Sequence, residues 1–311
     1  MKNWCSFLWI VLLLAACTPQ TAPVSVLPPV SASPVPAVSP VSEPTPSFLA
    51  SVTPTLPPTA TPQSTHSPTP THTLTLALTP TPHSPFPLSP PVLIPDTADP
   101  LFSVIDPSYR FASTQAGLRP VHHGVEFLLP FGSPVLAAAE GTVLFAGNDN
   151  IRGPYGPPRR HNYLGNFIVL EHPATLLAER GLGETVFYTV YAHLSELNVQ
   201  TGDTVRAGDQ IGLIGFTGAA LGPHLHFEVR LTGFTHADSF NPELFLNLPG
   251  RGVLAGRLLS EKGTPLLNTF NITALDTGKT LYITPYEDAK LAVRPPYREN
   301  FGLSLPPGSY E

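Results

Sequence analysis

Cysteine and charge are both scarce in this 311-residue sequence. It contains two cysteines, Cys5 and Cys17, and only 12% of its residues are charged. Two cysteines exclude a disulfide-rich scaffold and a zinc site built from cysteines. The net charge is −6, and lysine and arginine form no basic stripe. We therefore expect no nucleic-acid partner, because nucleic-acid-binding proteins gather positive charge on one face.

Proline, in contrast, is abundant and unevenly distributed. The sequence has 40 prolines, and 22 of them lie between Thr18 and Pro95, where Glu43 is the single charged residue. Proline fixes its own φ angle and favours an extended conformation in the preceding residue. We therefore predict a disordered, polyproline-II-like linker over residues 18–95, which as a coil would span roughly 50 Å.

The longest apolar run comes at the N-terminus, over residues 7–16. Ten residues rise ~15 Å as a helix, about half of the ~30 Å needed to cross a bilayer. With Lys2 before it and small residues after it, the run is typical of a secretory signal peptide. Leu14-Ala15-Ala16-Cys17 resembles the lipobox of bacterial lipoproteins. The resemblance implies a signal peptide over residues 1–17, a lipid on Cys17 and a lipid-anchored protein in the extracytoplasmic cell envelope. The alternative is an ordinary secretory signal with an accidental cysteine.

Residues 96–250 have the pattern of a β-rich domain. Short runs rich in valine, isoleucine, phenylalanine and tyrosine alternate with glycines, as in Gly141 to Gly147 and Gly165 to Leu170. This spacing predicts an antiparallel sheet or β sandwich, so the fold class is all-β. A helix is expected only around residues 173–180, ended by Gly181.

Four histidines in this domain fall in positions that suggest a metal site. His224 and His226 are two apart on a predicted strand, so both side chains point to one face. His193 ends another predicted strand, and His122 comes four residues before Glu126. Imidazoles and a carboxylate are the ligands that Zn²⁺ takes in hydrolytic sites. Each pair alone is a weak signal, because a lone histidine is more often structural.

The surrounding residues strengthen this interpretation. Between about Arg119 and Phe245 the sequence resembles the lysostaphin-type, or LytM-like, zinc metalloendopeptidases, which cut peptide bonds of peptidoglycan. The segments that carry the resemblance are His122-His123-Gly124-Val125-Glu126-Phe127, Gly132-Ser133-Pro134-Val135, Gly141-Thr142-Val143, Tyr191-Ala192-His193-Leu194 and Gly222-Pro223-His224-Leu225-His226-Phe227-Glu228. The family fold is an antiparallel β sandwich of the duplicated hybrid motif type, which agrees with the predicted strands.

The resemblance also implies roles for five residues. His122, Glu126 and His226 match the family's zinc ligands, and His193 and His224 match its two acid–base histidines. One position departs from the family pattern, because the acidic ligand there is aspartate and not glutamate. Glu228 shares a strand face with His226, so it is expected either to orient an imidazole or to be an ordinary exposed carboxylate.

The last segment, residues 251–311, again contains short alternating runs separated by Asp/Gly turns such as Asp276-Thr277-Gly278. This pattern predicts a small β sandwich. It weakly resembles carboxypeptidase-regulatory-like modules, in which a Leu-Pro-x-Gly-x-Tyr turn precedes further strands. Because the sequence stops at Glu311, we expect this module to be incomplete; the alternatives are that the chain is a fragment or that the segment is a self-sufficient short domain.

Three functions remain open at this point. The leading interpretation is a membrane-anchored zinc endopeptidase that hydrolyses peptide bonds in peptidoglycan with metal-activated water. The alternative is a weak or inactive family member that binds peptidoglycan and regulates other wall hydrolases. A purely structural envelope tether would explain the lipobox and linker but leaves the five matched site residues unexplained.

Overall fold

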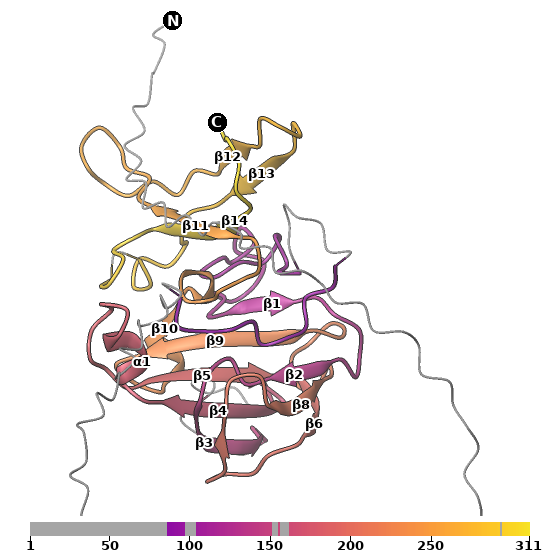
Figure 1. The fold of residues 1–311 in the computed structure, drawn as a ribbon. Helices are drawn as coiled ribbons and strands as arrows, with labels where there is room; N and C mark the ends of the chain where they lie inside the picture. The colour runs from indigo at the N-terminus through magenta and orange to yellow at the C-terminus, as the bar shows by residue number, and fades with distance from the viewer. Residues whose placement is uncertain (1–85, 97–103, 151–154, 156–161, 293) are drawn as a thin grey trace, which may run out of the picture. The chain divides into compact units, whose positions relative to one another are not determined.

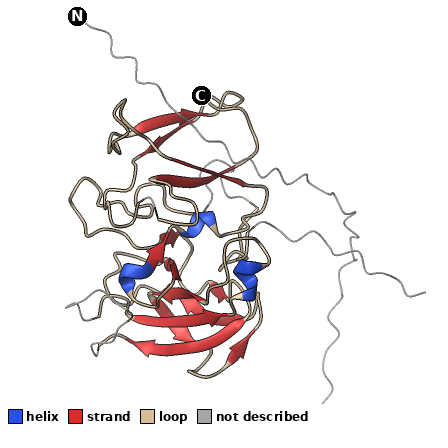
Figure 2. Cartoon of the chain, turned by 90° about the vertical axis from the view of Figure 1, so that its left-hand side faces the viewer, coloured by secondary structure: helices blue, strands red, loops and turns tan. Residues whose placement is uncertain are grey.

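The computed structural model of the chain describes residues 86–96, 104–150, 155, 162–292 and 294–311. Strands and loops make up nearly all of this part (Figure 2). Its helical elements are α1 (Thr175–Ala178), where the sequence predicted a helix, and the 3₁₀ turns η1 (His236–Asp238) and η2 (Pro242–Leu244). None of these is long and apolar enough to cross a membrane. The predicted signal peptide and the linker up to residue 85 lie outside the described residues.

A large antiparallel sheet carries seven of the fourteen described strands (Figure 1). Its order is β1-β9-β5-β4-β3-β7, and β10 also pairs with β9. The bounds are β1 (Val125–Phe127), β3 (Gly141–Asn148), β4 (Asn166–His172), β5 (Phe187–Ala192), β7 (Thr204–Val205), β9 (Leu225–Leu231) and β10 (Ser239–Phe240). β9 is buried along its whole length, because strands pair with it on both sides.

A second, three-stranded sheet of β2 (Pro134–Leu136), β8 (Gln210–Ile214) and β6 (Leu194–Leu197) packs against the first. Val135 and Ile211 of this sheet share one buried cluster with Tyr191 and Phe227 of the large sheet. Alternate side chains of a strand point to opposite faces, so each sheet contributes one face to this core. The prediction of an all-β, antiparallel β sandwich is confirmed.

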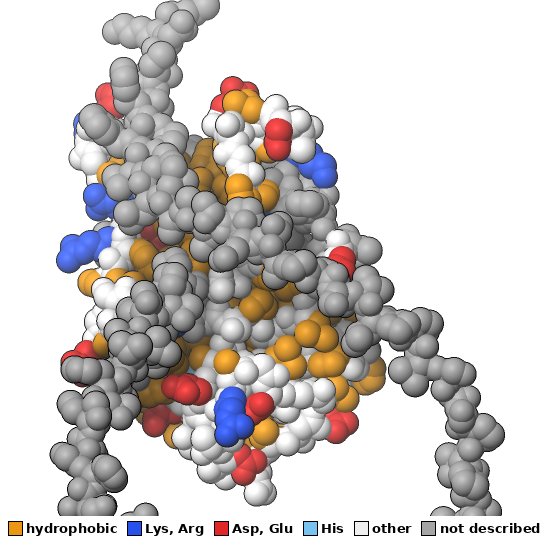
Figure 3. Space-filling model, in the orientation of Figure 1, with side chains coloured by type: hydrophobic (Ala, Val, Ile, Leu, Met, Phe, Trp, Pro, Cys, Tyr) orange, Lys and Arg blue, Asp and Glu red, His pale blue; other side chains and the backbone are white. Residues whose placement is uncertain are grey.

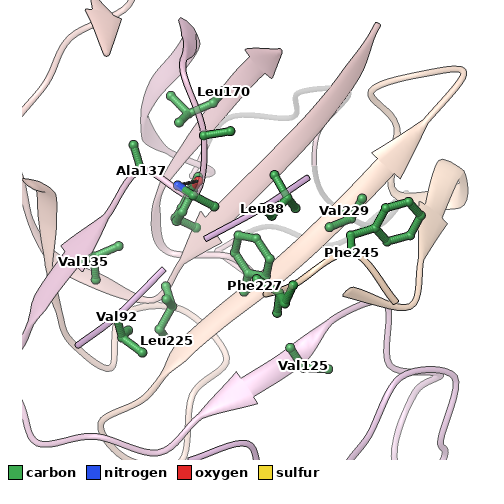
Figure 4. Packing of buried hydrophobic residues seen from close by; sticks show 14 of the residues in the cluster. Leu88, Val92, Val125, Val135, Ala137, Leu170, Leu225, Phe227, Val229 and Phe245 are labelled. Carbon is green, nitrogen blue, oxygen red and sulfur yellow. Dashed lines mark hydrogen bonds between the residues drawn. The ribbon is translucent and has the colours of Figure 1, made fainter. Parts of the chain in front are cut away.

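The end of the predicted linker belongs to this core. Leu88 and Val92 are almost completely buried, and Leu88 lies beside Phe227 and Val229 (Figure 4). The backbone of Leu88 donates to the carbonyl of Phe245 at 3.1 Å, and Val92 forms an antiparallel bridge with Val135. The prediction that the linker extends to residue 95 is therefore wrong for residues 86–95. Prolines exclude a regular inner strand but allow isolated contacts such as these. The prediction rested on the number of prolines and did not consider the apolar residues between them.

The C-terminal segment forms two smaller strand pairs. β11 (Gly252–Gly256) pairs with β14 (Phe301–Leu305), and β12 (Phe270–Thr273) pairs with β13 (Thr280–Ile283). Ile272, Leu281 and Leu303 form the centre of a small cluster of their own. On the face drawn in Figure 3, charged side chains of both signs are scattered among polar and apolar ones.

Candidate metal centre

The pairing of β1 with β9 brings two of the predicted ligands together. Glu126 lies opposite His226 in the antiparallel register, so both side chains leave the sheet on the same face. Gly124 precedes β1 and lies against β9, where a Cβ atom would come within 2.4 Å of the carbonyl oxygen of Phe227. Only glycine allows this close approach of the two backbones. Because the chain passes so near β9, His122 lies close to Glu126 and His226.

Three donor atoms converge at this spot. His122 Nε2 lies 2.9 Å from Glu126 Oε1 and 3.2 Å from His226 Nδ1. The distance from His226 Nδ1 to Glu126 Oε1 is also 3.2 Å. All three side chains are buried, and among the described residues they form the one group of histidine, cysteine and acidic side chains that could hold a metal ion.

The outer nitrogen of each ligand imidazole faces an acceptor. His122 Nδ1 lies 3.3 Å from the backbone carbonyl of Arg110, and His226 Nε2 lies 3.0 Å from Glu228 Oε1. A carbonyl or a carboxylate can only accept, so each outer nitrogen carries the hydrogen. In a neutral ring the inner nitrogens, His122 Nε2 and His226 Nδ1, then face each other with lone pairs. A positive charge between them, either a proton or a metal ion, removes this repulsion, so the donor set fits a metal.

Electrostatics at Glu126 support the same conclusion. Burial alone would raise the pKa of its carboxyl, but His226 and His122 hold the pKa well below its usual range. For His226 burial opposes protonation, yet Glu126 raises its pKa to about 10. Glu126 Oε2 is buried, and His224 Nε2 lies 2.9 Å from it. A buried carboxylate that stays ionised is a good metal ligand.

The two remaining predicted residues lie beside the three predicted ligands and outside the named strands. His193 connects β5 to β6 with a left-handed φ of 65°, and His224 comes one residue before β9. His193 Nδ1 donates to the carbonyl of Thr217 at 2.8 Å, and His224 Nδ1 donates to the carbonyl of Gly222 at 2.8 Å. Nε2 of each ring is left unengaged by these carbonyls, and His224 Nε2 lies 2.9 Å from Glu126 Oε2. The centroids of the two rings are 4.8 Å apart.

Burial keeps His193 neutral. It lowers the pKa of the imidazole to about 3, and the neighbouring His226 acts in the same direction. A neutral imidazole with a free Nε2 is a proton acceptor at neutral pH. The turn that holds it depends on Gly165 and Gly218, because a Cβ at Gly165 would lie 2.4 Å from the backbone of Thr217.

Further residues support the site. Glu228, for which two interpretations were open, is not an exposed carboxylate, because it is fully buried and contacts His226. Burial would raise the pKa of its carboxyl, but Arg230 and His236 hold it well below the usual range. Arg230 donates to Glu228 at 2.8 Å and was not predicted, because nothing in its local sequence separates it from an exposed strand arginine. Tyr109 was also missed, and its ring stacks on His122 with centroids 4.1 Å apart.

A cleft of about 480 Å³ opens over the site. All five predicted site residues line it, together with Asp106, Tyr109, Arg119, Pro120, Leu128, Tyr163, Ala219, Leu221, Gly222 and Pro223. The exposed side chains of Leu128 and Leu221 give its wall an apolar part. The metal ligands and the two further histidines therefore face the same open space, which can receive a substrate.

Comparison with known proteins agrees with this geometry. Residues 120–242 match peptidase family M23. Peptidoglycan DD-endopeptidase ShyA of Vibrio cholerae is 33% identical over 137 residues, which are 42% of this chain and 26% of that protein. Lysostaphin of Staphylococcus simulans is 34% identical over 149 residues, 48% of this chain and 25% of that protein. The chain thus spans about a quarter of the length of these relatives.

A solved structure is similar over the same region. The crystallised catalytic domain of lysostaphin from Staphylococcus simulans has 31% identity, covering 39% of this chain and 76% of that chain, with a TM-score of 0.30. A score this low adds nothing on the fold, which the strands above define. The family match covers the segment that supplies all five cleft residues. Residues 120–242 of this chain are therefore a domain of peptidase family M23.

Proposed function

We propose that this chain is a zinc endopeptidase that hydrolyses peptide bonds in peptidoglycan. The observation that carries the proposal is the meeting of His122, Glu126 and His226 under an open cleft that also contains His193 and His224. The match to peptidase family M23 supports the reaction class. Relatives named as peptidoglycan endopeptidases support the substrate class.

In this proposal His122 Nε2, Glu126 Oε1 and His226 Nδ1 hold Zn²⁺. Two imidazoles and one carboxylate make a known catalytic ligand set that leaves a position open for water. When bound, zinc lowers the pKa of a water toward ~7 and polarises a carbonyl group. The Glu126 side chain contributes the negative charge, and Glu228 and the Arg110 carbonyl fix the orientation of the two rings.

His193 and His224 divide the proton transfer and the charge stabilisation between them. One Nε2 accepts the proton of the attacking water and later delivers it to the leaving amine. The other would be an imidazolium, with Nδ1 and Nε2 both protonated, and would donate a hydrogen bond from Nε2 to the oxygen of the scissile carbonyl as negative charge develops there. The Thr217 and Gly222 carbonyls hold the two rings by Nδ1, so both can present Nε2 to the cleft.

The regulator alternative is less well supported. A protein that only binds peptidoglycan does not need a buried carboxylate and four histidines around one open space. Keeping the Glu126 charge buried requires compensation by His122 and His226. Such an arrangement is a costly one for a protein that does no chemistry there.

The test is digestion of purified peptidoglycan by the full chain, followed by chromatography and mass spectrometry of the released fragments. We expect peptide cleavage that stops with a chelator and returns with zinc. Fragments that are unchanged by a chelator, or no fragments from zinc-loaded protein, would contradict the enzyme. Binding to peptidoglycan without cleavage would support the regulator.

Membrane anchoring through a lipid on Cys17, with an extracytoplasmic location in the cell envelope, is a second part of the proposal. It rests on Leu14-Ala15-Ala16-Cys17 and on the short apolar run before it. Cys17→Ser should move the protein from the membrane fraction to the soluble extracytoplasmic fraction. A Cys17→Ser protein that sediments completely with membranes would count against the anchor.

The C-terminal segment, residues 251–311, is proposed to be a carboxypeptidase-regulatory-like module. Two antiparallel strand pairs around a small apolar cluster support this assignment. The remaining domain boundaries are proposed at residues 17, 85 and 250, with the peptidase domain beginning at residue 86, where the chain enters the core.

A further inference from the structure

Residues 109–113 hold His122, the proposed metal ligand, by ring stacking and hydrogen bonds. The Tyr109 ring stacks on the imidazole, with the two planes 6° apart. The Arg110 carbonyl lies 3.3 Å from Nδ1, and Ala112 N–H donates to the His122 carbonyl at 2.7 Å. His122 N–H in turn donates to the Ser113 carbonyl at 2.9 Å. The direction of His122 Nε2 is therefore set by where residues 109–113 lie.

The C-terminal segment in turn forms hydrogen bonds with residues 112–114. Glu287 N–H donates to the Ala112 carbonyl at 3.0 Å, and the Glu287 carboxylate accepts from Thr114 N–H. Ala112 is completely buried and has a left-handed φ of 60°. It contacts the metal ligand through its N–H and Glu287 through its carbonyl. One buried residue thus links the C-terminal segment to His122.

Apolar packing reinforces this link. The rings of Phe111 and Tyr286 meet edge to face, with centroids 5.2 Å apart. Phe111, Ala112, Tyr286 and Leu291 form a buried cluster, and Val121, the residue before His122, packs against it. The cluster therefore connects the C-terminal segment to Phe111 and Ala112 and to Val121, the residue before His122.

A second connection passes through Glu243 of η2. The Arg110 guanidinium binds the Glu243 carboxylate, which is almost completely buried. Glu243 Oε2 also accepts from Ser304 N–H at 2.8 Å and from the Ser304 hydroxyl at 2.9 Å. Ser304 belongs to β14, so the residue whose carbonyl orients His122 is connected to the C-terminal segment as well.

We propose that residues 286–304 are a positioning element of the metal site, with Glu287 as the main positioning residue. Glu287 fixes residues 112–114 and thereby aims His122 Nε2 at Glu126 and His226. This inference rests on the proposed function, because it assumes that His122 binds the metal. It goes beyond it, because residues 286–304 lie outside residues 120–242, which match the peptidase family.

The experiment compares zinc affinity, by competition with a chelator, in the full chain and in Glu287→Ala, Glu287→Asp and Glu287→Gln. Glu287→Ala should weaken binding about 10–100-fold, as expected when a residue that orients a ligand is lost. Glu287→Gln keeps an acceptor for Thr114 N–H and should restore most of the affinity. Glu261→Ala, at an exposed position of the same segment, is the matched control and should bind like the unaltered chain.

Two further readouts separate positioning from folding. The thermal unfolding midpoint in excess chelator reports the fold alone, and the visible spectrum of the cobalt-loaded protein reports the ligand geometry. We expect the spectrum to change in Glu287→Ala and to be normal in Glu287→Gln. Glu287→Asp shortens the side chain by one methylene group and so moves the carboxylate away from Thr114 N–H. If Glu287→Ala does not fold, the zinc affinity and cobalt spectrum of Glu287→Asp decide instead.

The outcomes distinguish this inference from the proposed function. Unchanged zinc affinity and cobalt spectrum in folded Glu287→Ala, or in folded Glu287→Asp where Glu287→Ala does not fold, would overturn the positioning role alone. An unaltered chain that binds no zinc would overturn the proposed function and this inference with it.

Discussion

The two sides of the cleft are built in different ways. On one side, Glu126 and His226 are opposite each other on paired strands, and their outer contacts are buried side chains such as Glu228. On the other side, His193 and His224 lie outside the strands, and the backbone carbonyls of loop residues hold their rings. Two of the three predicted ligands therefore belong to the sheet, whereas His122 and both predicted acid–base histidines lie outside its strands.

This difference follows from what each side has to do. A metal site requires donor atoms at nearly fixed distances, and a strand register provides them because it is held by many backbone hydrogen bonds. Acid–base groups must approach a substrate and exchange protons, so they are better placed on loops supported by a rigid scaffold. If this is correct, substitutions on the two sides should fail in different ways.

The largest effect is expected on the metal side, at Glu126. Glu126→Gln keeps the shape but removes the charge, so zinc affinity should fall by more than the ~10–100-fold typical of outer contacts, and hydrolysis should be lost. Glu126→Asp keeps the charge, and we expect zinc to be retained with altered activity. Metal content by elemental analysis, together with peptidoglycan turnover, measures both. About one equivalent of zinc and full activity in Glu126→Gln would remove this residue from the site.

The next effect is expected on the proton-transfer side. His193→Ala or His224→Ala should lower turnover about 10²–10⁴-fold while roughly one equivalent of zinc stays bound, because an acid–base group is lost and no ligand is. The measurements are kcat with a defined wall fragment and zinc content of the same preparation. Loss of zinc in either variant would mean that a ligand has been mistaken for a catalyst, and the contrast between the two sides would fail.

A smaller effect should follow from moving a loop without changing either histidine. Gly165→Ala places a Cβ 2.4 Å from the backbone of Thr217, whose carbonyl holds His193. A shift of about 1 Å in a catalytic group can cost up to ~10²-fold in rate, so we expect turnover to drop while zinc stays bound. Gly181→Ala is the control, because Gly181 has a similar φ of +69° with open space around it. Equal turnover in the two variants would contradict the role of the Gly165 turn.

The smallest effect concerns His172, a buried histidine of the core with no role in the cleft. Burial lowers its pKa to about 4, against the hydrogen bond to the Glu140 carbonyl, from an unfolded value near 6.5. The unfolded chain therefore binds more protons between these values, so the free energy of unfolding falls as the pH drops from ~6.5 to ~4, by about 3 kcal/mol at most.

The check is urea unfolding at pH 7.5 and pH 4.5 in excess chelator, for the unaltered chain and for His172→Gln. Glutamine has no charge to gain, so the variant should lose less stability between the two pH values. Parallel pH dependence in both proteins would show that His172 is already protonated in the fold or does not titrate.

The sequence determined the composition of the site and the class of the fold. Alternating apolar residues predicted the strands, because the two faces of a strand are exposed to different surroundings. Leu225 and Phe227 alternate with His224 and His226 along the chain, so they face the opposite side, and both are completely buried. All five predicted residues line one cleft. The faces of a strand are local features, so the order of residues along it predicts them, whereas the family resemblance indicated which five residues form the site.

The tertiary structure decided which distant groups support the site. Arg110 and Tyr109 orient His122, Glu287 contacts the stretch that carries them, and Arg230 neutralises Glu228. Glu287 is 173 residues from Thr114, whose N–H it accepts, so no local pattern marks this contact. Residues 86–95 show the same limit of prediction from local sequence. Their prolines predicted a linker, whereas Leu88 and Val92 are buried in the core. Burial is a property of the assembled fold, since the apolar surface that accepts a side chain comes from elsewhere in the chain.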